Sequence, residues 1–395
     1  MHFTYKHTKY ASYMGLVTQA IVNNLAPLLF VTFQRQFDIS LEKISLLIII
    51  NFAVQITTDF ISARYVDKVG YRAALMIANA CCFTGMMGLG MFPYVFSDAY
   101  AGLILAVVIN AIGGGIMEVV VSPVVEALPG DEKESAMSML HSFYCWGQVS
   151  VVIITTIYFN TVGIEHWRYI AMIWSLVPLF GGLLVLKVPM RALVEDGESI
   201  PLGKLFKVKL FWILFILMVC SGASELAMSQ WASLFAEEGL GVSKTLGDLL
   251  GPCFFAVLMG ISRTIYGIYG SKMDLKKTIA ASSAFCVISY LLAVFSPNPV
   301  VALLGCAFCG FSVGIMWPGV FSLSSKFYPQ GGTAMFAILA LGGDVGCAMG
   351  PGVVGFVAKV FQSINYGLLA AAVFPVILVI FILRLYKNAS VSKPI

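Results

Sequence analysis

The chain has 395 residues, of which 59% are hydrophobic and only 11% are charged, and its formal net charge is +4 at pH 7. A water-soluble domain could not bury that much apolar surface, so most of it must face lipid, which excludes a soluble protein. The small net charge is spread along the chain and provides no basic stripe for nucleic acid.

Apolar segments long enough to cross a bilayer recur along the whole sequence. A spanning helix needs roughly 20 apolar residues, and twelve stretches meet that length. The first lacks a small-residue cleavage site, so it is expected to be a retained helix and not a signal peptide. The predicted helices are 10–33, 42–64, 73–93, 99–126, 136–159, 166–187, 209–235, 245–269, 276–296, 299–326, 333–358 and 366–386.

One long polar stretch separates the sixth predicted helix from the seventh. It divides the chain into an N-terminal six-helix bundle (1–190), a cytoplasmic linker (191–208) and a C-terminal six-helix bundle (209–395). With the N-terminus inside, 19 basic residues are cytoplasmic and only five are outside: Arg35, Lys43, Arg168, Lys244 and Lys359. The positive-inside rule therefore predicts an integral protein of the cytoplasmic membrane with both termini in the cytoplasm.

The two halves repeat each other. The motif Gly-Ile-Met-Glu at 115–118 in the fourth helix returns as Gly-Ile-Met-Trp at 314–317 in the tenth, and each is followed by a proline, Pro129 or Pro329. Coincidence among small apolar residues is the alternative, but the matches fall in the order that a duplication of six helices requires.

A charged loop joins the second and third helices, Ala63-Arg64-Tyr65-Val66-Asp67-Lys68-Val69-Gly70-Tyr71-Arg72, and a weaker copy spans 267–272. This loop resembles the G-x-x-x-D-R/K-x-G-R/K-R/K loop of the major facilitator superfamily, with Ala63 in place of its first glycine. The resemblance implies an all-α membrane protein of twelve transmembrane helices in two six-helix halves related by a pseudo-twofold axis. Charge-assisted bonds from the loop to helix termini of the other half would hold the cytoplasmic side shut; the alternative is simple anchoring at the headgroups. The gating candidates are Asp67, Lys68, Gly70, Arg72 and Arg263.

Glu118 is an acid near the middle of the apolar fourth helix. Charges at that depth are costly and normally face a bundle interior or a wet cavity. Counting by fours gives one polar stripe, Asn110, Gly114, Glu118, Ser122 and Glu126. Desolvation would raise the pKa of the Glu118 carboxyl toward the range in which it loads and releases a proton. A protonated acid that bonds to a neighbouring helix is the structural alternative.

Other helices carry similar polar stripes, which together predict a wall of amides, hydroxyls and aromatic rings suited to a sugar or polyol. The second helix contributes Asp59 beside two amides. Asn and Gln in membrane helices also bond helix to helix, so that reading stays open. The substrate-binding candidates are Gln19, Asn23, Asn24, Asn51, Gln55, His141, Tyr144, Gln148, Gln230, Trp231 and Trp317.

Within the superfamily, the chain resembles the fucose permease branch of sugar:proton symporters. The likeness rests on Asn-Asn-Leu at 23–25, on Phe-Gln-Arg-Gln-Phe at 33–37, and on Glu118 five residues before Pro123. The branch has an aspartate where this chain has Pro27, which puts fucose itself and a two-carboxylate proton scheme in doubt. The resemblance implies Glu118 as the proton-coupling residue, with Glu225 or Asp344 in a second role.

These observations predict a secondary active transporter that takes up a sugar or related polar solute with protons by alternating access. Efflux of drugs or other amphipathic solutes and Na⁺-coupled sugar uptake remain alternatives, and a sensor that has lost transport is a more remote one. No nucleophile and base spacing, metal-ligand cluster or nucleotide loop is present in the sequence, so we expect no enzyme, metal or cofactor. We expect the lipid bilayer, a small molecule and a proton or Na⁺ as the only partners of a monomer.

Overall fold

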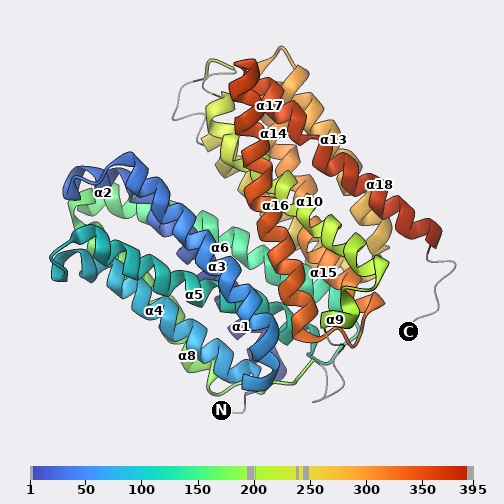
Figure 1. Cartoon of the computed structure of the whole chain (residues 1–395), viewed down its shortest axis with the longest axis horizontal. Coiled ribbons are helices and arrows are strands. Elements are labelled where there is room, and N and C mark those ends of the chain that lie inside the picture. Colours follow the sequence, from blue (N-terminus) through green and yellow to red (C-terminus); the bar gives the residue numbers. More distant parts are fainter. Residues whose placement is uncertain (1–2, 194–199, 201, 237–239, 243–248, 389–395) are drawn as a thin grey trace. The chain divides into compact units, whose positions relative to one another are not determined.

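The computed structural model describes residues 3–193, 200, 202–236, 240–242 and 249–388, and every helix and turn of that part of the chain is drawn in Figure 1. The described chain forms two compact units. Of the described residues, the first comprises 3–129, 143–193 and 332–337, and the second comprises 130–142, 200, 202–236, 240–242, 249–331 and 338–388. Each unit thus contains one short segment from the opposite half of the sequence. The predicted domain boundaries stay a prediction, and 194–199 and 201 of the predicted linker lie outside the described residues.

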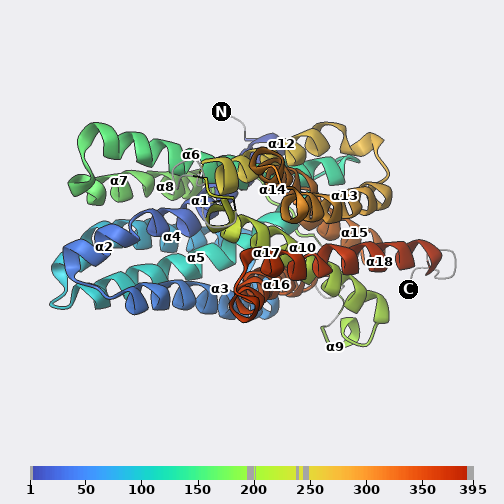
Figure 2. The same ribbon diagram turned by 90° about the horizontal axis from the view of Figure 1, so that it is seen from above.

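The first unit is built around α5, which packs against α4, α3 and α1; the views agree that α4 and α5 run side by side (Figures 1 and 2). A 3-10 turn, Ile164–His166, precedes the last two helices. The helices are α1 Tyr5–Leu28, α2 Phe30–Phe37, α3 Leu41–Val69, α4 Tyr71–Val95, α5 Ala99–Glu126, α6 Lys133–Val162, α7 Trp167–Trp174 and α8 Leu176–Val185. Residues up to Ser142 of α6 belong to the second unit.

In the second unit, α14 packs against α13, α12 and α10, while α18 packs against α13 and α10. A π turn, Leu249–Cys253, leads into α12. The helices are α9 Leu202–Leu205, α10 Lys209–Leu234, α12 Phe254–Tyr269, α13 Leu275–Phe295, α14 Pro299–Val313, α15 Met316–Phe327, α16 Gly332–Phe361, α17 Ile364–Ala371 and α18 Val373–Asn388. Residues 332–337 of α16 belong to the first unit.

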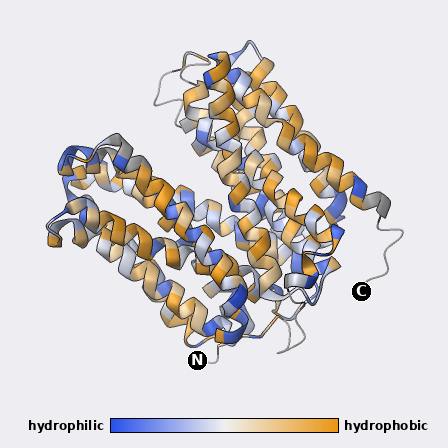
Figure 3. Ribbon diagram, viewed as in Figure 1, coloured by the Kyte–Doolittle hydropathy of each residue, from blue (hydrophilic) through white to orange (hydrophobic). Residues whose placement is uncertain are grey.

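Among the described residues, eleven helical segments are long and apolar enough to cross a membrane. Helix α1, which carries several amides, is not among them. Hydrophobic colour runs along the helices in Figure 3 and hydrophilic colour gathers at many of their ends. Large apolar side chains such as Phe60, Val95 and Phe356 are 61 to 73% exposed. Water would not tolerate such a surface, whereas lipid does, so the chain is an integral membrane protein.

Local side-chain bonds explain where several helices begin. The carboxylate of Asp98 accepts from the N–H of Tyr100 at 2.9 Å, and that of Asp274 accepts from Lys277 at 3.0 Å. Asn298 accepts from Val300 at 2.9 Å ahead of the helix that opens with Pro299. Each cap satisfies an N–H that the first helical turn leaves without a partner. The predicted start of the fourth spanning helix at 99 is confirmed for this reason.

Among the described residues, the predicted helix 10–33 is divided at Leu29 into α1 and α2, and three other predicted helices are divided just before a proline. Helices α7 and α8 are separated at Ser175, α14 and α15 at 314–315, and α17 and α18 at Ala372. Each break lies three residues before a proline: Pro178, Pro318 and Pro375. Proline lacks the N–H that would bond four residues back, and its ring crowds that carbonyl, so the helix breaks one turn earlier. An unbroken helix at each of these positions would need a backbone N–H to donate to the carbonyl four residues before the proline, and proline has none.

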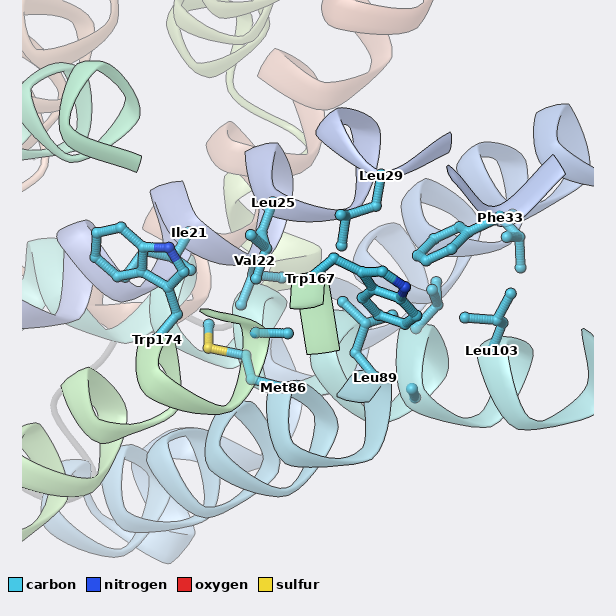
Figure 4. Packing of buried hydrophobic residues seen from close by; sticks show 14 of the residues in the cluster. Ile21, Val22, Leu25, Leu29, Phe33, Met86, Leu89, Leu103, Trp167 and Trp174 are labelled. Carbon is cyan, nitrogen blue, oxygen red and sulfur yellow. The ribbon is translucent and has the colours of Figure 1, made fainter. Parts of the chain in front are cut away.

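A cluster of buried hydrophobic residues, which includes Phe33 and Trp167, forms a core of the first unit (Figure 4). Trp167 is fully buried and meets Phe33 edge to face, with ring centroids 5.2 Å apart. Its indole N–H donates to Gln36 Oε1 at 2.7 Å, so the one polar atom of the ring is satisfied in an apolar setting.

Three glycines spaced by four in the sequence, Gly342, Gly346 and Gly350, predict a face of α16 that packs closely against another helix. Gly346 lies against the backbone of Val219 and Ala223, and Gly350 against the backbone of Ala223. A Cβ at either position would overlap backbone atoms, which cannot move aside as a side chain can. The close-packing prediction is confirmed for these two glycines.

This contact gives a stability prediction. We expect Gly346→Ala to lower the free energy of unfolding by about 1–3 kcal/mol, because overpacking forces the backbones apart. Gly352→Ala is the matched control, since a Cβ there meets nothing within 4 Å. Denaturant unfolding of both variants in detergent micelles measures the difference. Equal stability of the two would show that the close approach is not needed.

Candidate transport site

Five of the predicted site residues form a polar cluster in the first unit, which we call the first-unit cluster: Gln19, Asn23, Gln55, Glu118 and Tyr144. Gln19 Nε2 donates to Glu118 Oε2 between α1 and α5. Gln55 Nε2 donates to Asn23 Oδ1 at 3.0 Å, and Asn23 Nδ2 donates to Tyr144 Oη at 3.3 Å. Four helices, α1, α3, α5 and α6, thus bring one acid, three amides and a phenol together.

The first-unit cluster differs in burial along its length. Gln19 and Gln55 are only 4% and 2% exposed, whereas Asn23, Glu118 and Tyr144 are half-buried. Amides that bond to each other offer both donors and acceptors to a hydroxyl that displaces one of them. The cluster can therefore hold its helices together without a solute and exchange amide bonds for solute bonds.

Three more candidates lie on the same helices outside these bonds. Asn24 Nδ2 donates to the carbonyl of Ala20 at 2.8 Å, one turn back on its own helix. Asn51 on α3 and Gln148 on α6 are half-buried. The substrate role of these three remains a prediction.

In the second unit, Glu225 and Arg263 form a buried ion pair. Arg263 Nη2 lies 3.1 Å from Glu225 Oε2, and the two side chains are 4% and 12% exposed for Arg263 and Glu225 respectively. Arg263 Nη1 donates to the carbonyl of His141 at 3.3 Å, and its own carbonyl accepts from Ser138 Oγ at 2.8 Å. A charge of each sign at this depth is tolerated because each compensates the other.

Arg263 also compensates for the break between α14 and α15. Pro318 has no N–H for the carbonyl of Gly314, four residues earlier. Arg263 Nε donates to that carbonyl at 3.0 Å. The arginine, which the sequence groups with the gating loop, therefore lies inside the helix bundle and satisfies a broken backbone position.

The remaining second-unit candidates are placed mainly by packing. The indole N–H of Trp231 donates to the carbonyl of Pro351 at 3.1 Å, and Gln230 is exposed. The Trp317 ring packs on Gly343, beside Asp344, which is 9% exposed. His141 is buried with its ring 5.8 Å from that of Phe321. The bond from Trp231 to Pro351 supports the alternative that this aromatic side chain packs one helix against another.

The loop of the first gating motif depends on its glycine. Gly70, between α3 and α4, has φ +85°, a conformation that side-chain-bearing residues rarely adopt. The Arg72 guanidinium donates to the carbonyls of Val185, Leu186 and Val188 at 2.6–2.8 Å. These carbonyls end α8 of the same unit, so the described bonds of Arg72 satisfy a helix C-terminus there instead of one in the other half of the sequence. Asp67 and Lys68 are exposed.

Both copies of the motif contact the first turns of another helix. In the first unit, the hydroxyls of Tyr71 and Thr333 bond at 2.7 Å. In the second unit, the N–H of Ser271 donates to Ser135 Oγ at 2.9 Å. Backbone and hydroxyl groups make these bonds, where the sequence had predicted charged side chains. The gating role of the loop stays a prediction.

A titratable group outside the spanning helices follows the second copy. The pKa of Asp274 lies below its ordinary value, chiefly because its carboxylate accepts from the backbone N–H of Lys277. The bond favours the ionised form, which is the form that caps α13.

Asp59 is a buried acid that the sequence groups with Asn51 and Gln55 but does not single out. Its side chain is fully buried on α3. Its Oδ1 lies 3.1 Å from the position a Cβ would occupy at Gly115, one turn before Glu118 on α5. The sequence contains a signal that could have identified Asp59. The two copies of the loop motif open at Ala63 and Gly267, and Asp59 and Arg263 each stand four residues before the opening, so a charged residue occupies this position in both halves.

Comparison with known proteins gives the class of this fold and site. The sequence model of the Major Facilitator Superfamily matches residues 12–351. The chain therefore belongs to the Major Facilitator Superfamily, and its class is that of a membrane transporter.

Two curated proteins are similar in sequence. Membrane protein MosC of Rhizobium meliloti is 25% identical over 261 residues, which cover 64% of this chain and 61% of that protein. An uncharacterized MFS-type transporter of Yersinia pestis is 21% identical over 307 residues, 77% of each chain. The alignment thus spans less than two thirds of the rhizobial protein.

Solved structures show the fold. The transporter FucP in the outward conformation has a TM-score of 0.80 at 17% identity, covering 95% of this chain and 98% of that one. The proton:xylose symporter XylE, bound to 6-bromo-6-deoxy-D-glucose, has a TM-score of 0.83 at 14% identity, covering 96% and 95%. These likenesses confirm the predicted major facilitator fold.

Proposed function

We propose that this protein is a proton-coupled secondary active transporter that takes up a sugar or related polyol by alternating access. The observation that carries the proposal is the bond from Gln19 to Glu118 within the first-unit cluster. It joins one acid in a spanning helix to the amide of Gln19, one turn before Asn23, which bonds to Gln55 and Tyr144. Two of the similar solved structures belong to proteins named as sugar:proton symporters, fucose for one and xylose for the other.

The chemistry of the first-unit cluster suits a solute rich in hydroxyl groups. Each amide offers donors and an acceptor, and Tyr144 offers a hydroxyl that both donates and accepts. A sugar hydroxyl can take the place of either partner in the bond between Gln55 and Asn23. A hydrophobic cation cannot, and it would leave buried amides without partners.

Glu118 supplies the coupling to protons. Its ionised form is unfavourable in a spanning helix, and a proton removes that cost. A loaded, neutral site would reorient readily, and release of the proton would restore the charge that Gln19 then stabilises by donating to it. Substrate and proton would thus leave on the same side of the membrane.

Currents in liposomes test the proposal. Purified protein is placed under an inward proton gradient, and hexoses, pentoses and polyols are supplied in turn. The proposal predicts an inward current with at least one of them and none with hydrophobic cations. Flux of hydrophobic cations alone would point to drug efflux, and sugar currents that require sodium and ignore the proton gradient would replace the coupling ion. Either result would overturn the proposal.

A further inference from the structure

An arginine and two tyrosine rings meet at one end of the first unit. The guanidinium carbon of Arg168, in α7, lies 4.5 Å from the ring centre of Tyr94 in α4 and 5.6 Å from that of Tyr169. These residues lie near the ends of two candidate membrane spans, Tyr71–Val95 and Ile164–Val185. Tyrosines at such positions lie at the level of the lipid headgroups, so the arginine does too.

The charge of Arg168 has no counter-charge in the described part of the chain. No carboxylate pairs with it there, and its Nε is buried without a hydrogen-bond partner. Glu165, one turn earlier, lies 4.0 Å from His166 instead. Contact with a ring face stabilises a cation less than a charge-assisted bond to an anion does. An anion from outside the described chain would supply the missing partner.

A second donor belongs to the same tyrosine ring. The indole N–H of Trp167 donates to Gln36 Oε1 at 2.7 Å, which fixes the orientation of that amide. Gln36 Nε2 then donates to Tyr94 Oη at 2.8 Å. Because the phenol oxygen accepts this bond, its own hydrogen is left to donate, and no acceptor for it occurs among the described residues. Tyr94 is 42% exposed, so a ligand can reach its hydroxyl.

Exposed apolar side chains continue from this point along α7 and α8. Tyr169, Ile173, Leu176 and Phe180 recur at intervals of three or four residues, and each is 44 to 58% exposed. Ser175, between the two helices, keeps helical dihedral angles, so these side chains share one face. An apolar face suits an acyl chain, whereas a free anion in water gains nothing from it. The polar donors and the apolar face together therefore fit a phospholipid.

We propose that Arg168 and Tyr94 bind the phosphate of an anionic phospholipid, with an acyl chain along the exposed face of α7 and α8. The guanidinium and the phenol hydroxyl supply two donors for the unesterified oxygens of a phosphodiester. A lipid with a net negative charge is favoured over a zwitterionic one, because the ammonium group of the latter already compensates its phosphate. This site shares no residue with the first-unit cluster and does not depend on the proposed function.

Native mass spectrometry of the full-length protein in an uncharged detergent tests the inference, because it counts bound lipids directly. Phosphatidylglycerol or phosphatidylcholine is titrated in. The wild type should retain one phosphatidylglycerol at concentrations that leave phosphatidylcholine unbound. Arg168→Gln should weaken phosphatidylglycerol binding about tenfold, as expected for the loss of one charge-assisted bond. Tyr94→Phe keeps the ring beside the guanidinium and should weaken binding about threefold, as expected for the loss of one neutral hydrogen bond.

Lys43→Gln is the matched control for the loss of a positive charge beside a tyrosine ring. Lys43 is exposed, and its Nζ lies 5.1 Å from the ring centre of Tyr100. The hydroxyl of that tyrosine donates to the Lys43 carbonyl at 2.8 Å, so it offers a lipid no second donor. This variant should bind phosphatidylglycerol as the wild type does.

Four results would overturn the inference. Equal weakening by Lys43→Gln and Arg168→Gln would show a general attraction of charge. Unchanged binding in Arg168→Gln, or in Tyr94→Phe if Arg168→Gln does not fold, would remove the assigned donors. Equal affinity for phosphatidylcholine would remove the preference for an anionic lipid. An excess of inorganic phosphate should leave the lipid bound, and displacement by it would show that the site takes a free anion.

Discussion

Glu118→Gln should abolish accumulation of substrate driven by a proton gradient and leave substrate counterflow at a rate comparable to that of the wild type. The glutamine keeps the shape of a protonated acid and its bond to Gln19, so the loaded carrier can still reorient. It cannot release a proton, so the gradient no longer does work. With one proton per substrate, the wild type should accumulate about tenfold per pH unit of gradient, because each factor of ten corresponds to about 1.4 kcal/mol. The variant should reach only the external concentration.

Glu165→Gln is the matched control for removal of one negative charge. Glu165 lies in the turn before α7 with its side chain 69% exposed. We expect this variant to accumulate substrate as the wild type does. Retained accumulation in Glu118→Gln, measured with radiolabelled solute in the same liposomes, would remove Glu118 from the coupling mechanism.

Arg263→Gln should cause the largest loss of stability among single changes in the second unit. It leaves the Glu225 carboxylate buried without its counter-charge and removes the donor to the carbonyl of Gly314. Breaking a buried ion pair from one side costs about 3–5 kcal/mol. Denaturant unfolding in detergent micelles measures the loss.

A double-mutant cycle separates the pair from the backbone bond. The double variant Glu225→Gln with Arg263→Gln should be more stable than Arg263→Gln alone, because no unpaired charge remains. Lys326→Gln is the control, since Lys326 pairs with Glu134 but is 57% exposed and should cost about 1 kcal/mol or less. Equal effects of Arg263→Gln and Lys326→Gln would contradict the assignment of the buried pair.

Much of the fold follows from local sequence signals. The helix at 99–126 was predictable to the residue because Asp98 caps it and a long apolar run follows. The breaks at Ser175 and Ala372 could also have been predicted from the sequence, because each lies three residues before a proline. A count of apolar residues does not register them, because proline alters backbone bonding without lowering hydrophobicity much.

The candidate site was harder to predict from the sequence, because its hydrogen bonds join residues that are far apart in the chain. Residue types and spacing suggested that polar stripes on several helices line one wall, with Gln19, Asn23, Gln55, Glu118 and Tyr144 among them. Which of these side chains bond to each other depends on how four helices pack. Glu225 and Arg263 are 38 positions apart and no periodicity links them. Trp231 was predicted to contact the substrate because an aromatic ring suits a sugar. In the structure its indole N–H donates to a backbone carbonyl.

The central claim, that a sugar and a proton move together through the first-unit cluster, is tested most directly by pH inside liposomes. A pH-sensitive dye is enclosed with the wild-type protein at equal pH on both sides, and the sugar that gives a current is added outside. Downhill entry of the sugar should acidify the interior, and Glu118→Gln should show entry without acidification. Sugar entry with no change of internal pH in the wild type would contradict the account.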